Sequence, residues 1–123
     1  MTGQEVLERA VALLGYTDEN GAPDAGQLAG LYKRGVALID QLCSDLTAAE
    51  GGTPTVVSSL SAPLPLTEAT ARGVLPYGVA MLIAAARGDG DNQALFSALY
   101  TAKRRIVCRR ERVQDVLPRG WEQ

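Results

Sequence analysis

The most constraining feature of this sequence is the segment Leu66–Arg112, in which an apolar stretch and a basic amphipathic stretch are joined by a short polar turn. The first stretch reads LTEATARGVLPYGVAMLIAAARG, the turn DGDN, and the second stretch QALFSALYTAKRRIVCRRER. Two segments of helical length joined by so few residues are typical of an antiparallel helical hairpin. Because the apolar member must be covered, the rest of the chain is expected to supply the helices that bury it.

The composition agrees with a helical fold. The chain of 123 residues is 46% hydrophobic and only 5% aromatic, so alanine and leucine fill most apolar positions. Such side chains favour helices packed with their axes close together over a β-sandwich. The length suits one hydrophobic core. The sequence therefore predicts an all-α fold and a single domain over residues 1–123.

Apolar residues recur at helical spacing in four segments, which predict helices over about 3–15, 25–49, 67–87 and 91–112. A residue suited to cap the first turn lies at or just before the start of each segment, and the expected caps are Thr2, Asp24, Thr67 and Asp91. Glu5 follows Thr2 at the spacing of a capping box, and Gly15 is suited to end the first helix.

Small residues and one proline complicate two of these helices. Gly26, Gly30 and Gly35 in the second segment either let a neighbouring helix approach closely or mark a later helix start. The third segment is expected to form the central core helix, with Gly78 allowing close packing. Pro76 lacks an N–H and clashes with a preceding turn, so it either kinks this helix or divides it into two.

Two segments are expected to be irregular. Residues 52–66 contain Pro54, Pro63 and Pro65, which exclude a helix and predict a long protruding arm. A short strand or hairpin is compatible with its β-prone part. Its valines and leucines, Val56, Val57 and Leu60 among them, need either the chain's own core or a neighbouring subunit to lie on. Residues 114–123, with Pro118 and Gly120, are expected to form an irregular tail.

The charge is unevenly distributed along the chain. Residues 1–90 carry 5 basic and 10 acidic side chains, whereas residues 91–123 carry 7 basic and 4 acidic ones. Six of the basic residues form a cluster in the last predicted helix: Lys103, Arg104, Arg105, Arg109, Arg110 and Arg112. This cluster is either a solvated helix face that pairs with acids of the first two helices, such as Glu5 or Asp40, or a surface for DNA phosphates or an acidic partner.

Few residues suggest chemistry. The chain has no histidine, and neither Gly51-Gly52 nor the Gly88/Gly90 pair has the lysine and spacing of a phosphate-binding loop. Cys43 and Cys108 lie singly in helical patterns and are expected to be reduced thiols. No secretion signal and no membrane-spanning stretch are expected. We therefore expect no catalytic residues, no bound metal and no cofactor.

The order of these parts resembles the small helical head–tail connector proteins of tailed bacteriophages. The resemblance rests on the helices in QEVLERAVALLGY and LYKRGVALIDQLCSDL, the arm, and above all VLPYGVAMLIAAARGDGDNQALFSALYTAKRR. That last piece is similar to a recurring pair in the family, an apolar helix followed by a helix of Phe/Tyr-x-x-x-Tyr type with a basic end. The resemblance covers residues from about Gln4 to Arg112, and none of the matched positions is catalytic.

The resemblance implies a structural subunit of the virion neck, made in the bacterial cytoplasm. Such subunits form a homo-oligomeric ring beneath the portal protein, contact the next neck or tail protein, and surround a channel through which DNA passes without being read. The isolated subunit can be a monomer. Two alternatives remain: a small helical DNA-binding or packaging module that uses residues 103–112, and a helical bundle with an assembled carboxylate site.

Overall fold

The computed structural model describes residues 1–16, 20 and 25–121, without the side chains of residues 25–29, 32 and 108–121. Its helices are α1 (Gly3–Leu14), α2 (Ala25–Ala49), α3 (Glu68–Gly73), α4 (Leu75–Ala86) and α5 (Gly90–Trp121). No strand occurs in these described ranges, where the one β-bridge pairs Thr2 with Pro63. The prediction of an all-α fold is confirmed.

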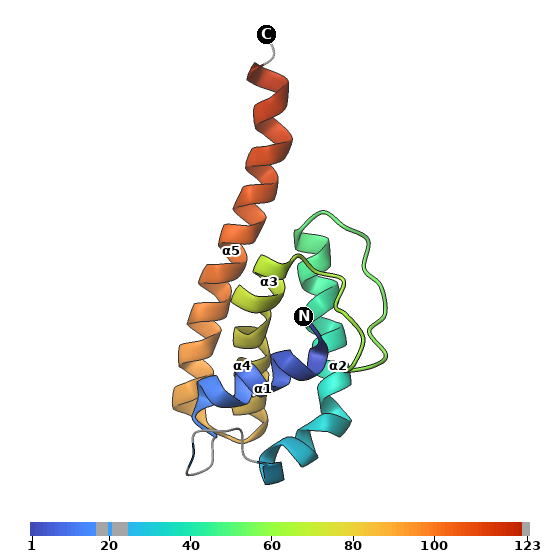
Figure 1. The fold of residues 1–123 in the computed structure, drawn as a ribbon. Helices are drawn as coiled ribbons and strands as arrows, with labels where there is room; N and C mark the ends of the chain where they lie inside the picture. The colour runs from blue at the N-terminus through green and yellow to red at the C-terminus, as the bar shows by residue number, and fades with distance from the viewer. Residues whose placement is uncertain (17–19, 21–24, 122–123) are drawn as a thin grey trace.

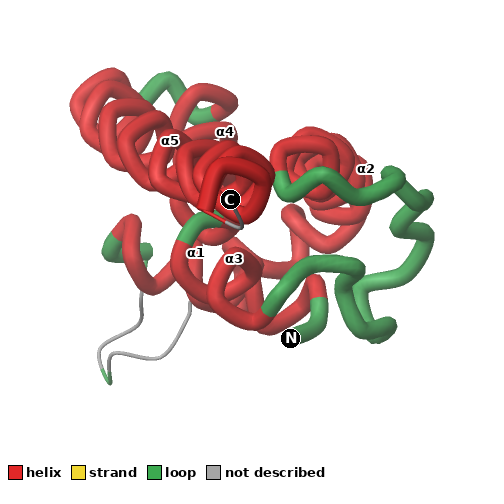
Figure 2. Tube along the Cα trace, turned by 90° about the horizontal axis from the view of Figure 1, so that it is seen from above, coloured by secondary structure: helices red, strands yellow, loops and turns green. Residues whose placement is uncertain are grey.

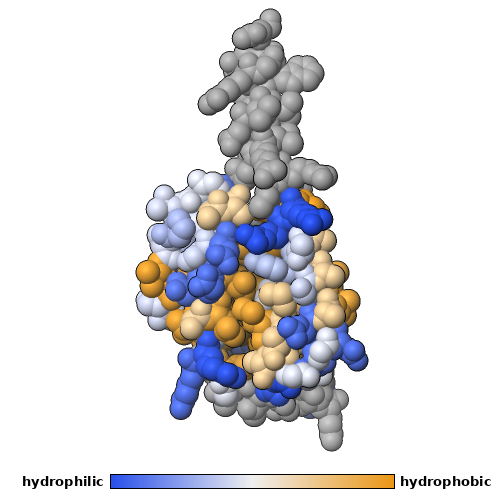
Figure 3. Space-filling view, turned by 180° about the vertical axis from the view of Figure 1, so that it is seen from behind, coloured by the Kyte–Doolittle hydropathy of each residue, from blue (hydrophilic) through white to orange (hydrophobic). Residues whose placement is uncertain are grey.

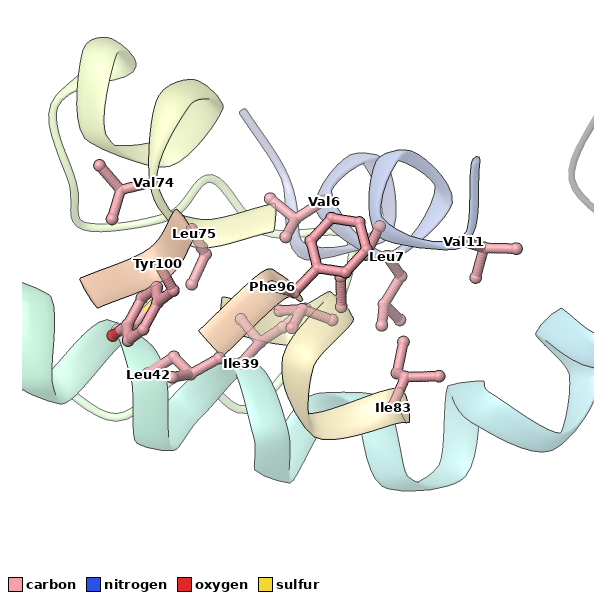
Figure 4. Packing of buried hydrophobic residues seen from close by; sticks show 14 of the residues in the cluster. Val6, Leu7, Val11, Ile39, Leu42, Val74, Leu75, Ile83, Phe96 and Tyr100 are labelled. Carbon is pink, nitrogen blue, oxygen red and sulfur yellow. The ribbon is translucent and has the colours of Figure 1, made fainter. Parts of the chain in front are cut away.

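Helix α4 lies at the centre of the bundle. It packs against α5, α1, α2 and α3, as Figures 1 and 2 show. Its side chains Leu75, Val79 and Ala80 are inaccessible to solvent. Val6 and Leu7 from α1, Ile39 and Leu42 from α2, and Phe96 and Tyr100 from α5 complete the core around it (Figure 4).

Two close helix crossings depend on glycine. A Cβ atom at Gly35 would lie 2.5 Å from Leu7 Cδ1, so a larger residue at this crossing of α1 and α2 would force the Leu7 side chain to move. At Gly78, a Cβ atom would lie 2.7 Å from Cε1 of Tyr100, which seats the Tyr100 ring directly on the α4 backbone. The expectation that small residues allow close packing is confirmed at both positions, whereas Gly30 has open space beside it.

Two predicted N-caps and one predicted C-cap are confirmed. The Thr2 side chain accepts a hydrogen bond from the Glu5 N–H at 3.3 Å, and Gly15 ends α1 in the left-handed region with φ 82°. The Thr67 side chain accepts from the Thr70 N–H, also at 3.3 Å. Asp24, the cap expected for the second helix, lies outside the described residues.

The prediction of Asp91 as the cap of the last helix is wrong, because α5 begins one residue earlier, at Gly90. The Asp89 side chain accepts a hydrogen bond from the Asn92 N–H at 3.3 Å, and the backbone carbonyl of Asp89 accepts one from the Gln93 N–H at 2.9 Å. Gly88, with φ 71°, turns the chain immediately before it. The turn is therefore tighter than expected, and Asp91 already lies in the first turn of the helix.

The expected third helix is divided into α3 and α4. Val74 joins them with φ −119° and ψ −50°, and Pro76 lies in the first turn of α4. A proline there loses no hydrogen bond, because the first N–H groups of a helix have no internal partner. By length and composition alone, the segment 68–86 could cross a membrane. However, 56% of its most apolar part is buried inside the protein, and a core helix passes the same test.

The expectation of an irregular tail over residues 114–123 is wrong, since α5 continues to Trp121. The residues between Arg109 and Leu117 are mostly good helix formers, and an established helix extends readily through such residues. Pro118 lies in the last turn of α5, which ends at Trp121. The second half of α5 consequently extends well beyond the rest of the protein (Figure 1).

The arm over residues 52–66 protrudes less than expected. Residues 51–56 are exposed, but Val57 and Leu64 are buried in the core. The backbone of the arm is held by the N-terminal segment: the Gln4 N–H donates to Leu60 O, and the Leu64 N–H donates to Met1 O, both at 3.0 Å. The outer part of the arm lies on the side of α2 that faces away from α5, and the rest returns past the N-terminal segment to α3 (Figures 1 and 2).

Candidate functional site

The basic cluster begins where α5 leaves the body of the protein. Lys103 is half-buried, and its Nζ lies 4.4 Å from the centre of the Tyr77 ring, a cation–π contact. Arg104 and Arg105 are exposed. Arg109, Arg110 and Arg112 follow in the projecting part of α5, and their side chains lie outside those described.

The first three basic residues do not pair with the acids of α1 and α2. Among the described side chains, the ion pairs are Glu68 with Arg72 at 3.0 Å and Glu68 with the N-terminal amine at 3.5 Å. Asp40 instead accepts the Val57 N–H at 2.8 Å. Arg104 and Arg105 are therefore available to a group outside the chain, which argues against the interpretation of a face neutralised by its own acids.

The three arm residues separate into different environments. Val57 is 8% exposed and packs in the core, and Leu60 is half-buried against it. Val56 is 83% exposed, more than any other large apolar side chain among those described. Only Val56, in the exposed part of the arm, therefore remains available to a neighbouring subunit.

Helix α5 carries a second surface that the sequence analysis had not separated from the core face. Phe96 and Tyr100 are buried against α4, but Leu95 is 52% exposed and Ile106 is 56% exposed. With half-buried Leu99 and exposed Ala102, they form a row along one side of the helix. We call these residues, Leu95, Leu99, Ala102 and Ile106, the α5 strip.

A finer use of the helical period could have found the strip. At 100° per residue, Phe96, Tyr100 and Val107 point in one direction, and Leu95, Leu99 and Ile106 point roughly 80° to 120° away from it. The helix therefore has an apolar arc wider than one neighbouring helix covers. The sequence pattern alone places both groups on one apolar face of the helix, whereas in the structure Leu95 and Ile106 are more than half exposed.

The acids around the α4–α5 turn have a structural role. Asp89 accepts hydrogen bonds from the Asn92 side chain at 2.7 Å and from the Tyr16 hydroxyl at 3.1 Å. Arg87 lies over the Tyr16 ring, 5.0 Å from its centre. The bonds from Asn92 lower the pKa of the Asp89 carboxyl, while burial and the Asp89 bond raise the pKa of Tyr16. This arrangement ties the end of α1 to the start of α5.

Other chemically capable groups are dispersed. Within the described part of the chain, no three acidic, cysteine or histidine side chains are grouped to hold a metal ion. Cys43 is buried, and burial, assisted by the charge of Asp40, raises the pKa of its thiol to about 11. A thiol in this environment stays protonated near neutral pH and is a poor nucleophile.

One face of the protein, seen in Figure 3, has apolar side chains gathered near its middle and polar ones around them.

Comparison with family models, with curated proteins and with solved structures finds no match to this chain.

Proposed function

We propose that this chain is a structural subunit of a phage or prophage particle, a head–tail connector that assembles beneath the portal, catalyses no reaction and binds no cofactor. The observation that carries the proposal is the projection of α5 beyond a small helical body. An isolated helix is marginally stable in water, so a long projecting one is typical of a protein that completes its packing against others.

The arrangement of the exposed segments is compatible with a ring. The exposed part of the arm and helix α5 lie on opposite sides of α2. Head-to-tail contacts that close into a ring need two different surfaces on one subunit, placed so that one can meet the other on the next copy. The resemblance described above supports the same assembly, with the portal and an adjacent neck or tail protein as partners.

The proposal is tested by co-sedimentation with the portal protein encoded nearest in the same genome, together with sizing by light scattering. The proposal predicts that the chain binds the portal in a fixed, ring-like stoichiometry, whether or not it is a monomer alone. Replacing Val56 by serine should weaken the assembly and leave the melting temperature of the isolated chain unchanged. A folded chain that does not bind the portal at micromolar concentrations contradicts the proposal.

A second candidate is favoured by the exposed arginines. Arg104 and Arg105 have no ion-pair partner among the described side chains, as expected of residues that bind DNA phosphates. A DNA-binding module predicts salt-sensitive affinity for duplex DNA, with a smaller salt dependence after both arginines are changed to glutamine. Absence of duplex binding at low salt would exclude this candidate and leave the connector proposal intact.

A further inference from the structure

We propose that the α5 strip is the docking surface for an amphipathic helix with acidic flanks, supplied by a partner protein. The inference builds on the proposed function, in which α5 is an attachment surface, and adds the chemistry of the partner. It rests on two observations, the exposure of the strip and the charge of the residues on both sides of it.

The strip has the spacing of a helix–helix seam. Its residues are separated by four, three and four positions, which keeps them on one side of α5 over about 17 Å. Leu95 and Ile106 are more than half exposed, and the body of the protein already covers the neighbouring face that holds Phe96 and Tyr100. The sequence repeats the seven-residue spacing of Leu99 and Ile106 at Val113. A partner helix laid along α5 would bury this row.

Basic residues lie on both sides of the strip. Lys103 flanks it on the side nearer α4, where its contact with Tyr77 fixes its position. Arg105 flanks it on the other side and is exposed. Lys103, Arg104 and Arg105 are the only charged residues between Leu95 and Ile106. Flanking charges of one sign select a partner helix whose own flanks carry the opposite sign.

The same charges argue against other occupants. Two copies of this stretch paired with each other would place lysine and arginine against like charges. The exposed part of the arm, Thr53–Val56, has no charge to complement them. Duplex DNA would satisfy the arginines but would leave Leu95 and Ile106 in water. An acidic amphipathic helix satisfies both the apolar and the charged part of the surface.

The test uses the full chain and a synthetic helical peptide of 21 residues, with leucines at alternating three- and four-residue spacing and glutamates beside them. A twin peptide carries lysine in place of each glutamate. Binding is measured by fluorescence anisotropy at low salt, and the contact is mapped by NMR on the methyl groups of Leu95, Leu99 and Ile106. We expect saturable binding of the acidic peptide, no binding of its twin, and shifts confined to the strip.

Two double variants distinguish binding at the α5 strip from non-specific binding to other exposed apolar residues. Replacing Leu95 and Ile106 by serine should weaken peptide binding by at least about tenfold, because the variant lacks the apolar surface that the peptide would bury. Replacing Leu13 and Val56, the other large apolar residues that are exposed among the described side chains, by serine should leave binding unchanged. Arg105→Gln should weaken binding less and reduce its salt dependence. All variants change exposed residues, so their melting temperatures should match the parent.

Three results would overturn the inference: no saturable binding of the acidic peptide, equal binding by the Leu95/Ile106 variant, or displacement of the peptide by duplex DNA. A dimer of the chain that disappears in the same variant would also overturn it, in favour of a second copy. Portal co-sedimentation of the parent separates this inference from the proposed function. Portal binding without peptide binding refutes only the acidic helix, whereas a failure to bind the portal refutes the connector.

Discussion

The arm and helix α5 differ in how their backbones are satisfied, and this difference decides which of them leaves the body of the protein. The arm is irregular, so its N–H and C=O groups need partners outside the segment, and it obtains them from Asp40, Met1 and Gln4. Helix α5 satisfies its own backbone and can extend into solvent without such partners. An apolar, irregular segment is therefore drawn onto the core, whereas a charged helix is free to project.

The strongest test of this comparison concerns the part of α5 that is packed on the body. Changing Tyr100 to alanine removes a buried ring that rests on Gly78, and we expect it to lower the free energy of unfolding by about 3 to 5 kcal/mol. Changing exposed Ile106 to alanine should alter it by less than about 0.5 kcal/mol. Urea unfolding of both variants gives the two values. Equal losses would mean that α5 is not anchored through Tyr100.

The arm is tested by two adjacent valines. Changing buried Val57 to alanine should lower the free energy of unfolding by about 1 to 2 kcal/mol, because two methyl groups leave the core. The same change at exposed Val56 should have an effect below about 0.5 kcal/mol. Thermal unfolding followed by circular dichroism is sufficient to compare them. If the two variants melt alike, the arm is not docked on the core as described.

Cys43 reports on the core near Asp40, the residue that holds the arm. Its pKa is raised from 9.0 to about 11, so the folded state favours the neutral thiol. That contribution is complete below pH 9 and is lost as the pH rises toward 11, where the unfolded chain ionises first. In a Cys108→Ser background, the stability difference from the Cys43→Ala variant should therefore shrink over this range. A difference that is constant between pH 8 and 11 would show that Cys43 is not shielded.

The smallest expected effect concerns the start of α5. The pKa of Asp89 is lowered from 3.8 because Asn92 donates to its carboxylate. Its contribution is present above pH 3.8 and is lost as the pH falls through the lowered value. The melting temperature of the parent should therefore exceed that of Asp89→Asn near neutral pH and approach it in strong acid. Asp91→Asn serves as the control, and a larger effect there would restore Asp91 as the cap.

The sequence predicts the helices and several of their ends because those depend on local chemistry. Thr2, Gly15 and Thr67 act as expected, since capping involves only residues a few positions apart. Asp89 and Asp91 are both suited to cap α5, and the choice between them depends on how tightly Gly88 turns the chain. Local chemistry alone does not decide between such close alternatives.

The candidate surfaces were harder to predict because they depend on which face of each segment finds a neighbour. Val56 and Val57 are the same residue type, yet Val56 is exposed and Val57 is buried. The Asp40 side chain of α2 accepts the Val57 N–H and so holds Val57 against the core. Leu95 and Phe96 differ in the same way, because α4 covers one side of α5. The sequence does specify the basic cluster, and the structure adds the apolar row beside it.

The contact between Tyr100 and Gly78 sets the orientation of α5, and therefore the position of its far end. Val107 is the last of the described side chains of α5 that packs on the body, and residues 108–121 continue the helix for about 21 Å beyond it. A tilt of roughly 5° at the crossing would displace the far end by about 3 Å, more than a well-packed interface tolerates. The close contact between Tyr100 and Gly78 therefore also determines where the far end of α5 can meet a neighbour.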